Sequence, residues 1–190
     1  ASMLDETLVN VLRMRNLPDV QKLLAPKWLR AVRTADWLST QIPPQSNFQM
    51  YTFNTTPAVL VEGTDGQWLS GSDVKHLNGA IDALKRTVPR DGTSLINAFN
   101  VAKLFNPLPD QIVIVTDKPV SFAAAASSGR IMDYPFTLIE MRMKPNEKGE
   151  GKMLAATSIL VKNGRLELEN YGQEPVRLTE ITEQERKKKS

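Results

Sequence analysis

Hydrophobic positions along the chain follow helical spacing in some segments and strand-like runs in others. Apolar residues three or four positions apart predict amphipathic helices, which cover 4–15, 27–41, 73–86 and 94–105. Runs of aromatic and β-branched residues predict strands, at 48–53, 58–62, 111–116 and 136–141. Strands that alternate with helices in this order predict an α/β fold with a doubly wound, mostly parallel sheet flanked by helices.

Turn-forming and capping residues set the expected ends of these elements. Pro43 and Pro44 end the helix over 27–41, because proline cannot continue a helix. Asp19 is expected to cap a short helical turn, and Ser72 the helix over 73–86. The run over 112–115 is four consecutive β-branched residues, which is typical of a fully buried central strand of a parallel sheet.

The pattern changes after Met143, and three regions follow from it. Residues 1–143 are expected to form the α/β domain. Residues 144–182 are expected to form a β-hairpin extension, because Asn163-Gly164 separates two strand-like runs. That extension loosely resembles the start of an immunoglobulin-like domain. Residues 183–190 form a basic tail with four cations and two glutamates.

Composition excludes several kinds of chemistry. The 190 residues contain no cysteine, which rules out disulfides, iron–sulfur clusters and thiol nucleophiles within the chain. A single histidine, His76, excludes a multi-histidine metal site and is expected to be a surface residue. No apolar run approaches the roughly 20 residues of a membrane helix. The net charge is +3, and cations concentrate in the tail and between Arg13 and Arg33. The second cluster indicates either a solvated helix face or a surface for phosphate or an acidic protein.

Two loops carry oxygen ligands to the expected carboxyl edge of the sheet, where open α/β sheets bind ligands. Residues 91–95 open a helix, and residues 116–119 leave the run over 112–115. They combine the carboxylate of Asp117 with several hydroxyls, a set that suits Mg²⁺ or Mn²⁺. Aspartate at a strand end and threonine at a helix start are also common without any metal.

These residues resemble a known family. Gly92-Thr93-Ser94-Leu95, followed by the run from Pro109 to Asp117, resembles the second and third segments of the metal-ion-dependent adhesion site of von Willebrand factor A domains of bacterial type. The opening Ala1-Ser2-Met3 resembles the end of the first segment, Asp-x-Ser-x-Ser, and the resemblance extends over 1–142. The chain is therefore expected to begin inside that segment, without the family's first central strand.

The resemblance implies a ligand set for Mg²⁺ or Mn²⁺. Ser2 and Thr93 would bind the cation through their hydroxyls, Asp117 would hold it directly or through a water, and an acidic side chain of a protein partner would complete the coordination. Two departures from the family pattern weaken metal binding. The aspartate and first serine of the first segment are absent, and Lys118 with a proline replaces the usual glycine after Asp117.

The leading hypothesis is a non-enzymatic protein-interaction module of this type, in the cytoplasm or at the membrane of a bacterium. Trp68 and Lys118 are candidate contacts to the partner. The alternatives are a metal-free structural or assembly domain, and basic-patch binding of nucleic acid or another anionic surface. No small-molecule substrate is expected. An enzyme is disfavoured, because the chain has no phosphate-binding glycine loop, nucleophile elbow or evident acid/base pair.

Overall fold

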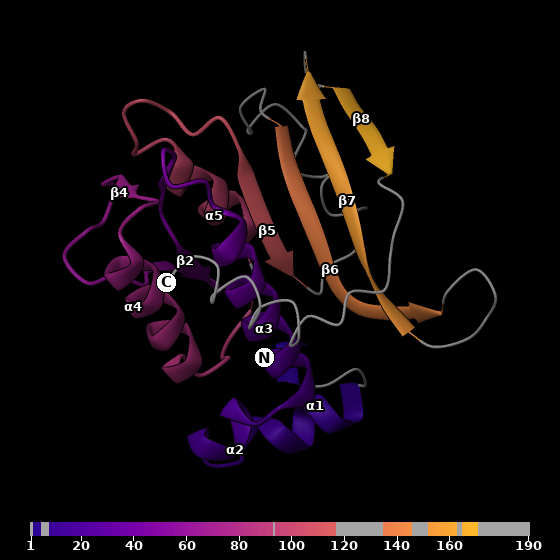
Figure 1. Ribbon diagram of the computed structural model, residues 1–190. Helices are drawn as coiled ribbons and strands as arrows, with labels where there is room; N and C mark the ends of the chain where they lie inside the picture. The colour runs from indigo at the N-terminus through magenta and orange to yellow at the C-terminus, as the bar shows by residue number, and fades with distance from the viewer. Residues whose placement is uncertain are drawn as a thin grey trace. The chain divides into compact units, whose positions relative to one another are not determined.

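The computed structural model of the chain describes residues 2–4, 8–92, 94–116, 135–145, 152–162 and 165–170. The chain divides into two compact units, with the change from the first to the second between Phe105 and Asn106. Figure 1 labels the helices and strands of both units. None of the described helices is long and apolar enough to cross a membrane.

Helices make up most of the first unit. The described part of this unit contains a 3₁₀ turn and five α-helices: η1 (Ser2–Leu4), α1 (Leu8–Arg15), α2 (Asp19–Leu23), α3 (Pro26–Gln41), α4 (Val74–Arg86) and α5 (Leu95–Ala102). The four helices predicted from spacing are confirmed, with α1 described from Leu8 rather than from residue 4 and α5 ending at Ala102 rather than at residue 105. The predicted short turn at Asp19 is α2, with Pro18 rather than Asp19 in the N-cap position.

The N-caps of α4 and α5 are polar side chains that accept backbone hydrogen bonds. Asp73, not the expected Ser72, caps α4, because its Oδ1 accepts from the backbone N–H of His76 at 3.1 Å. The Ser72 hydroxyl instead lies 2.8 Å from the hydroxyl of Ser70. Ser94 caps α5, with its hydroxyl 3.4 Å from the backbone nitrogen of Asn97. Each cap satisfies a donor that the first helical turn leaves without an intrahelical partner.

Two small antiparallel ladders connect the helices of the first unit. β1 (Asn47–Phe48) pairs with β4 (Leu69–Ser70), and β2 (Tyr51–Phe53) pairs with β3 (Pro57–Val59). The strand predicted over 48–53 is therefore two short strands with different partners. β4 lies within 63–71, a segment for which the hydrophobic pattern predicts no strand.

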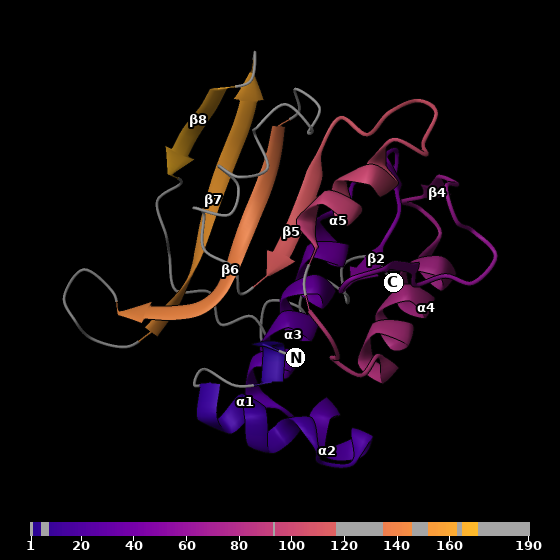
Figure 2. The same cartoon turned by 180° about the vertical axis from the view of Figure 1, so that it is seen from behind.

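A small apolar cluster joins these strands to the helices. Phe48, Leu69 and Leu77 are buried together, with Ile42, Met50 and Val61 packed against them. Helix α3 also packs against α4 (Figure 2). On α3 the hydroxyls of Thr34, Ser39 and Thr40 are buried, and each donates to a carbonyl of the preceding turn at 2.6–2.9 Å. Those bonds remove the cost of burying unpaired hydroxyls.

The second unit contains one four-stranded sheet in the order β5-β6-β7-β8. The strands are β5 (Ile112–Thr116), β6 (Pro135–Pro145), β7 (Lys152–Lys162) and β8 (Arg165–Asn170). β5 and β6 are parallel, whereas β6/β7 and β7/β8 are antiparallel. The predicted antiparallel pairing of the two runs is confirmed, since β7 and β8 pair from Thr157↔Asn170 to Lys162↔Arg165. Asn163 and Gly164 lie outside the described residues.

The helices and strands confirm a mixture of α and β structure, but the doubly wound parallel sheet is not found in the described residues. β5/β6 is the one parallel pair among the described strands. The expected continuous burial of β5 is wrong. Val113 is 40% exposed while Ile114 is 4% exposed, so side chains on opposite faces of the strand differ in burial.

The predicted boundary after Met143 lies inside β6, and β6 pairs with β7 from Pro135↔Leu160 to Pro145↔Lys152. The first strand of the predicted extension therefore continues a sheet that begins at β5. The Ig-like extension and the basic tail over 183–190 remain predictions, and the tail lies outside the described residues.

Candidate functional site

Hydrogen bonds join the loop that precedes α5 to the turn that follows β2. The backbone N–H of Ser94 donates to the carbonyl of Asn54 at 2.7 Å, and the Asn97 amide donates to the carbonyl of Thr55 at 2.6 Å. The Asn54 amide donates in turn to the Asp91 carboxylate at 3.3 Å. Three hydrogen bonds thus fix the loop at the C-terminal end of β2.

Local backbone chemistry explains why these residues form the loop. Asn54 accepts a hydrogen bond from the backbone N–H of Thr56 at 2.7 Å through its side chain, which closes an Asx-type turn. Asp91 has φ of 58°, in the left-handed region that aspartate tolerates better than most residues. Its exposed carboxylate and the Ser94 hydroxyl give the loop an oxygen-rich surface.

The structure locates only part of the ligand set implied by the resemblance. Ser2 begins η1, two residues before Leu4, which is 1% exposed and anchors that turn. Thr93, Asp117 and Lys118 lie outside the described residues. The donor chemistry fits a hard cation, since two hydroxyls and a carboxylate are all oxygen ligands. The three-residue set itself stays a prediction.

The described part of the chain offers no other evident metal centre, since it contains no group of three or more His, Cys, Asp or Glu side chains placed to hold an ion. The side chain of His76 contacts Asp73, the residue that caps the same helix: its Nδ1 lies 2.8 Å from Oδ2 of Asp73. The backbone N–H of His76, more than any other contact, lowers the pKa of the Asp73 carboxyl. Both contacts between Asp73 and His76 stabilise the N-terminus of α4.

Trp68, the candidate partner contact, is half-buried rather than free in a loop. Its ring lies 4.5 Å from that of Phe105 at 46°, and Phe105 also meets Tyr51 edge-on at 6.2 Å. Aromatic pairs in these geometries add to stability beyond their buried area. A structural role for Trp68 is thus visible, and a role in partner contact remains a prediction.

A polar network around the Tyr51 hydroxyl was not anticipated from the sequence. The Tyr51 hydroxyl donates to the Asp65 carboxylate at 2.7 Å and accepts from the backbone N–H of Gly66 at 2.9 Å. Burial is the main reason that the pKa of Tyr51 is raised to about 12. The signal available in the sequence was the alternation in 48–53, which places Gln49 and Tyr51 opposite Phe48 and Met50.

Gln49, two residues before Tyr51, binds the segment between Thr64 and Gln67 through its side-chain amide. Its amide nitrogen lies 2.9 Å from the carbonyl of Thr64, 3.0 Å from the Thr64 hydroxyl and 2.9 Å from the carbonyl of Gln67. Its amide oxygen accepts from the backbone N–H of Met50 at 2.9 Å. Gln49 and Tyr51 together give the segment before β4 a defined conformation.

No protein-family model matches the chain, and no curated protein matches it. A solved structure, "von Willebrand factor type A from Catenulispora acidiphila", is similar at 19% sequence identity and a TM-score of 0.44. The similarity covers 59% of this chain and 28% of that one, so this chain spans less than a third of that protein. The structure is thus similar to a protein of the family that the sequence resembles.

Proposed function

We propose that the chain is a non-enzymatic protein-interaction module of the von Willebrand factor A type, which binds an acidic side chain of a protein partner through Mg²⁺ or Mn²⁺. The observation that carries the proposal is the fastening of the loop before α5. Ser94 and Asn97 are both bound to backbone carbonyls of the turn after β2, at 2.7 and 2.6 Å. Thr93, which the resemblance implies as a ligand, belongs to this loop.

In this proposal the chain's own residues hold the cation and leave a coordination position for the partner. Ser2 and Thr93 contribute hydroxyl oxygens, and Asp117 contributes a carboxylate. The bound cation supplies positive charge to which a partner carboxylate binds. Lys118 adds a second positive charge, which competes with the cation electrostatically and also attracts an acidic partner.

The test is a thermal melt of the full chain with Mg²⁺, Mn²⁺ or EDTA. A cation that binds only the folded state stabilises it by about 2.7 kcal/mol at a hundredfold excess over Kd. We expect Thr93→Ala and Asp117→Ala to abolish the shift. Thr55→Ala and Asp110→Ala are matched controls, because they remove the same side-chain types, both side chains are exposed, and neither belongs to the proposed ligand set.

Absence of any metal-dependent shift in a protein that still melts cooperatively would overturn the metal proposal. A metal-dependent shift in melting temperature that persists in both Thr93→Ala and Asp117→Ala would show that other residues bind the ion. Either result leaves the interaction module without its proposed means of binding.

A second candidate function, metal-free association through helices, is favoured by exposed apolar side chains on α1 and α2. Val9 and Leu12 on α1 are 59% and 54% exposed, and Val20 in α2 and Leu24 just after it are 69% and 65% exposed. Val9 and Leu12 are three positions apart on α1 and so lie on the same side of the helix, where exposed apolar side chains favour contact with another apolar surface. Sedimentation velocity with EDTA tests this candidate: a concentration-dependent oligomer that Val20→Asp dissociates would support it, and a monomer at all concentrations would exclude it.

A further inference from the structure

Helix α5 is attached to the hairpin of β2 and β3 near both of its ends. At the N-terminal end, the side-chain amide of Asn97 donates to the backbone carbonyl of Thr55 at 2.6 Å. Just beyond the C-terminal end, the buried ring of Phe105 meets the ring of Tyr51 edge-on at 6.2 Å. The helix also packs against both strands of the hairpin. Because both attachments reach the same hairpin, α5 cannot shift along it without breaking one of them.

The loop that precedes α5 is held on both sides of Thr93. On one side, the Asp91 carboxylate accepts from the side-chain amide of Asn54 at 3.3 Å. On the other side, the backbone N–H of Ser94 donates to the backbone carbonyl of Asn54 at 2.7 Å. One residue of the turn after β2 therefore contacts the loop two positions before Thr93 and one position after it.

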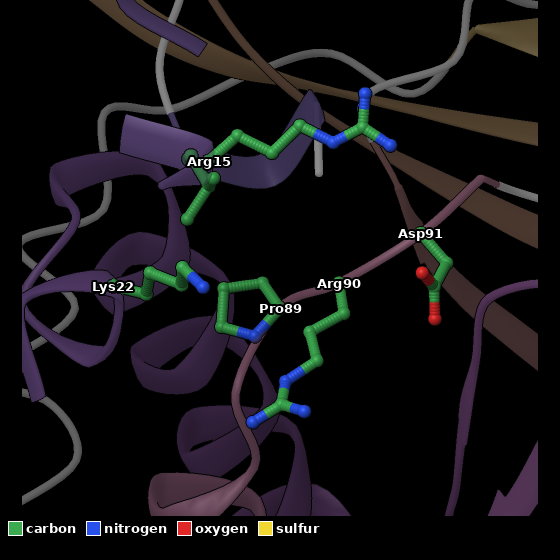
Figure 3. A pocket seen from close by; sticks show the side chains of 6 residues that line it. Arg15, Lys22, Pro89, Arg90 and Asp91 are labelled. Atoms are coloured by element: carbon green, nitrogen blue, oxygen red, sulfur yellow. The ribbon is translucent and has the colours of Figure 1, made fainter. Parts of the chain in front are cut away.

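The neighbour of Asp91 in sequence does not compete with Asn54 for this carboxylate. Asp91 lies at a pocket of about 160 Å³ that is also lined by Arg15, Lys22 and Arg90. Figure 3 shows the Asp91 carboxylate apart from the guanidinium of Arg90. Arg90 is paired instead with Asp19 of α2. The segment after α4 therefore presents Asp91 to the turn after β2.

Asn97 is the side chain in this arrangement that can be removed with the least disturbance elsewhere. Asn54 also closes its own turn by accepting from the backbone N–H of Thr56 at 2.7 Å, so its loss would change the turn itself. Asn97 lies three residues after the N-cap Ser94, inside α5. Alanine is a better helix former than asparagine, so Asn97→Ala removes the bond to Thr55 without weakening the helix.

We propose that Asn97 is a positioning residue for the cation-binding loop. Its amide holds the start of α5 against the turn after β2 and thereby keeps the loop that carries Thr93 in the conformation that binds the cation. A loop that is competent for only a fraction of the time binds more weakly by that fraction. Asn97 contacts neither the cation nor the partner, so it acts on affinity through the loop. This inference rests on the proposed function.

The first test is calorimetric titration of the full chain with MnCl₂. Asn97→Ala should weaken binding about two- to tenfold, the range expected for the loss of one hydrogen bond. Asn100→Ala is the matched control, because Asn100 is an exposed asparagine of the same helix. Its side chain accepts from Lys103 at 3.1 Å, a contact at the other end of α5.

The second test is backbone amide hydrogen exchange in EDTA, which does not depend on the metal. The Ser94 amide, which donates to Asn54 at 2.7 Å, should exchange faster in Asn97→Ala than in Asn100→Ala by about threefold or more. Amides of α4 should exchange at the same rate in both variants. A general loss of stability would instead speed exchange in α4 as well.

The outcomes separate this inference from the proposed function. Equally tight Mn²⁺ binding by Asn97→Ala and Asn100→Ala would overturn the positioning role and leave the proposed function intact. Weaker binding by Asn97→Ala with faster exchange throughout α4 would show that Asn97 supports the fold as a whole, which also contradicts the positioning role. No Mn²⁺ binding by the unmodified chain would refute the proposed function, and the positioning role with it.

Discussion

In the first unit, side chains reach from one element to the backbone of another, whereas in the second unit the strands pair through their own backbones over long registers. β1 and β4 share two residue pairs, but β6 and β7 pair from Pro135↔Leu160 to Pro145↔Lys152. Two-stranded ladders this short are not stable by themselves in water. The two ladders of the first unit therefore depend on side-chain hydrogen bonds and on packing against its helices, whereas the second unit has an extended hydrogen-bond ladder.

This difference predicts which substitutions each unit tolerates without loss of stability. In the first unit, one amide or one glycine fixes a whole loop, so substitution there should have effects out of proportion to the buried area removed. In the second unit, loss of stability should follow burial along a strand.

The largest effect is expected in β5 of the second unit. Ile114→Ala should lower the free energy of unfolding by about 2–5 kcal/mol, because it removes a side chain that is 4% exposed and leaves a cavity. Val113→Ala, at 40% exposure on the opposite face, should cost about 1 kcal/mol or less. Urea unfolding measures both. Equal costs would contradict the alternating burial of β5.

Gly71 provides the next test, in the first unit. A Cβ at this position would lie 2.5 Å from the carbonyl oxygen of Pro43 and 2.7 Å from that of Ser46. Gly71→Ala should therefore cost about 1–3 kcal/mol through overpacking, since backbone must move. In contrast, Gly79→Ala in α4, where nothing lies within 4 Å, should raise stability by up to about 1 kcal/mol. Thermal melts that show the same sign for both would refute the close approach at Gly71.

Gln49→Leu measures the importance of a single amide in the first unit. It removes the hydrogen bonds to Thr64 and Gln67, each worth about 0.5–1.5 kcal/mol, so the expected cost is about 1–3 kcal/mol. Gln67→Leu removes only a 3.4 Å contact to the Gly63 carbonyl and should cost less than about 0.5 kcal/mol. Chemical denaturation compares the pair. If Gln49→Leu were as mild as its control, side-chain fastening would not distinguish the first unit.

The smallest effect is expected from Tyr51, through pH. Its pKa is about 12 in the folded chain and 10.0 is the ordinary value, so the unfolded chain loses this proton first. The contribution to stability is present in full below pH 10 and is lost as pH rises toward 12. Tyr51→Phe should therefore flatten the decline of the melting temperature between pH 10 and pH 12. An unchanged slope would show that burial does not raise the pKa of Tyr51.

Local chemistry made much of the secondary structure predictable. The helices over 27–41 and 73–86 were predicted to within about a residue at each end, because apolar spacing and the prolines after Gln41 act on the chain locally. The hairpin of β7 and β8 was predictable for the same reason, since Asn-Gly favours a tight turn. The metal-site prediction had only a sequence resemblance behind it, and the fastening of the loop before α5 was not foreseen.

The sequence by itself determined where helices and strands form, because period and turn chemistry are properties of a few neighbouring residues. Only the tertiary structure decided which strands pair, which face of β5 is buried, and that Gln49, Tyr51 and Asn54 fasten their loops. It also decided that Arg15, Lys22 and Arg90 share one pocket, although 75 residues of sequence separate the first from the last. These outcomes depend on contacts between residues far apart in the chain, which no local pattern encodes.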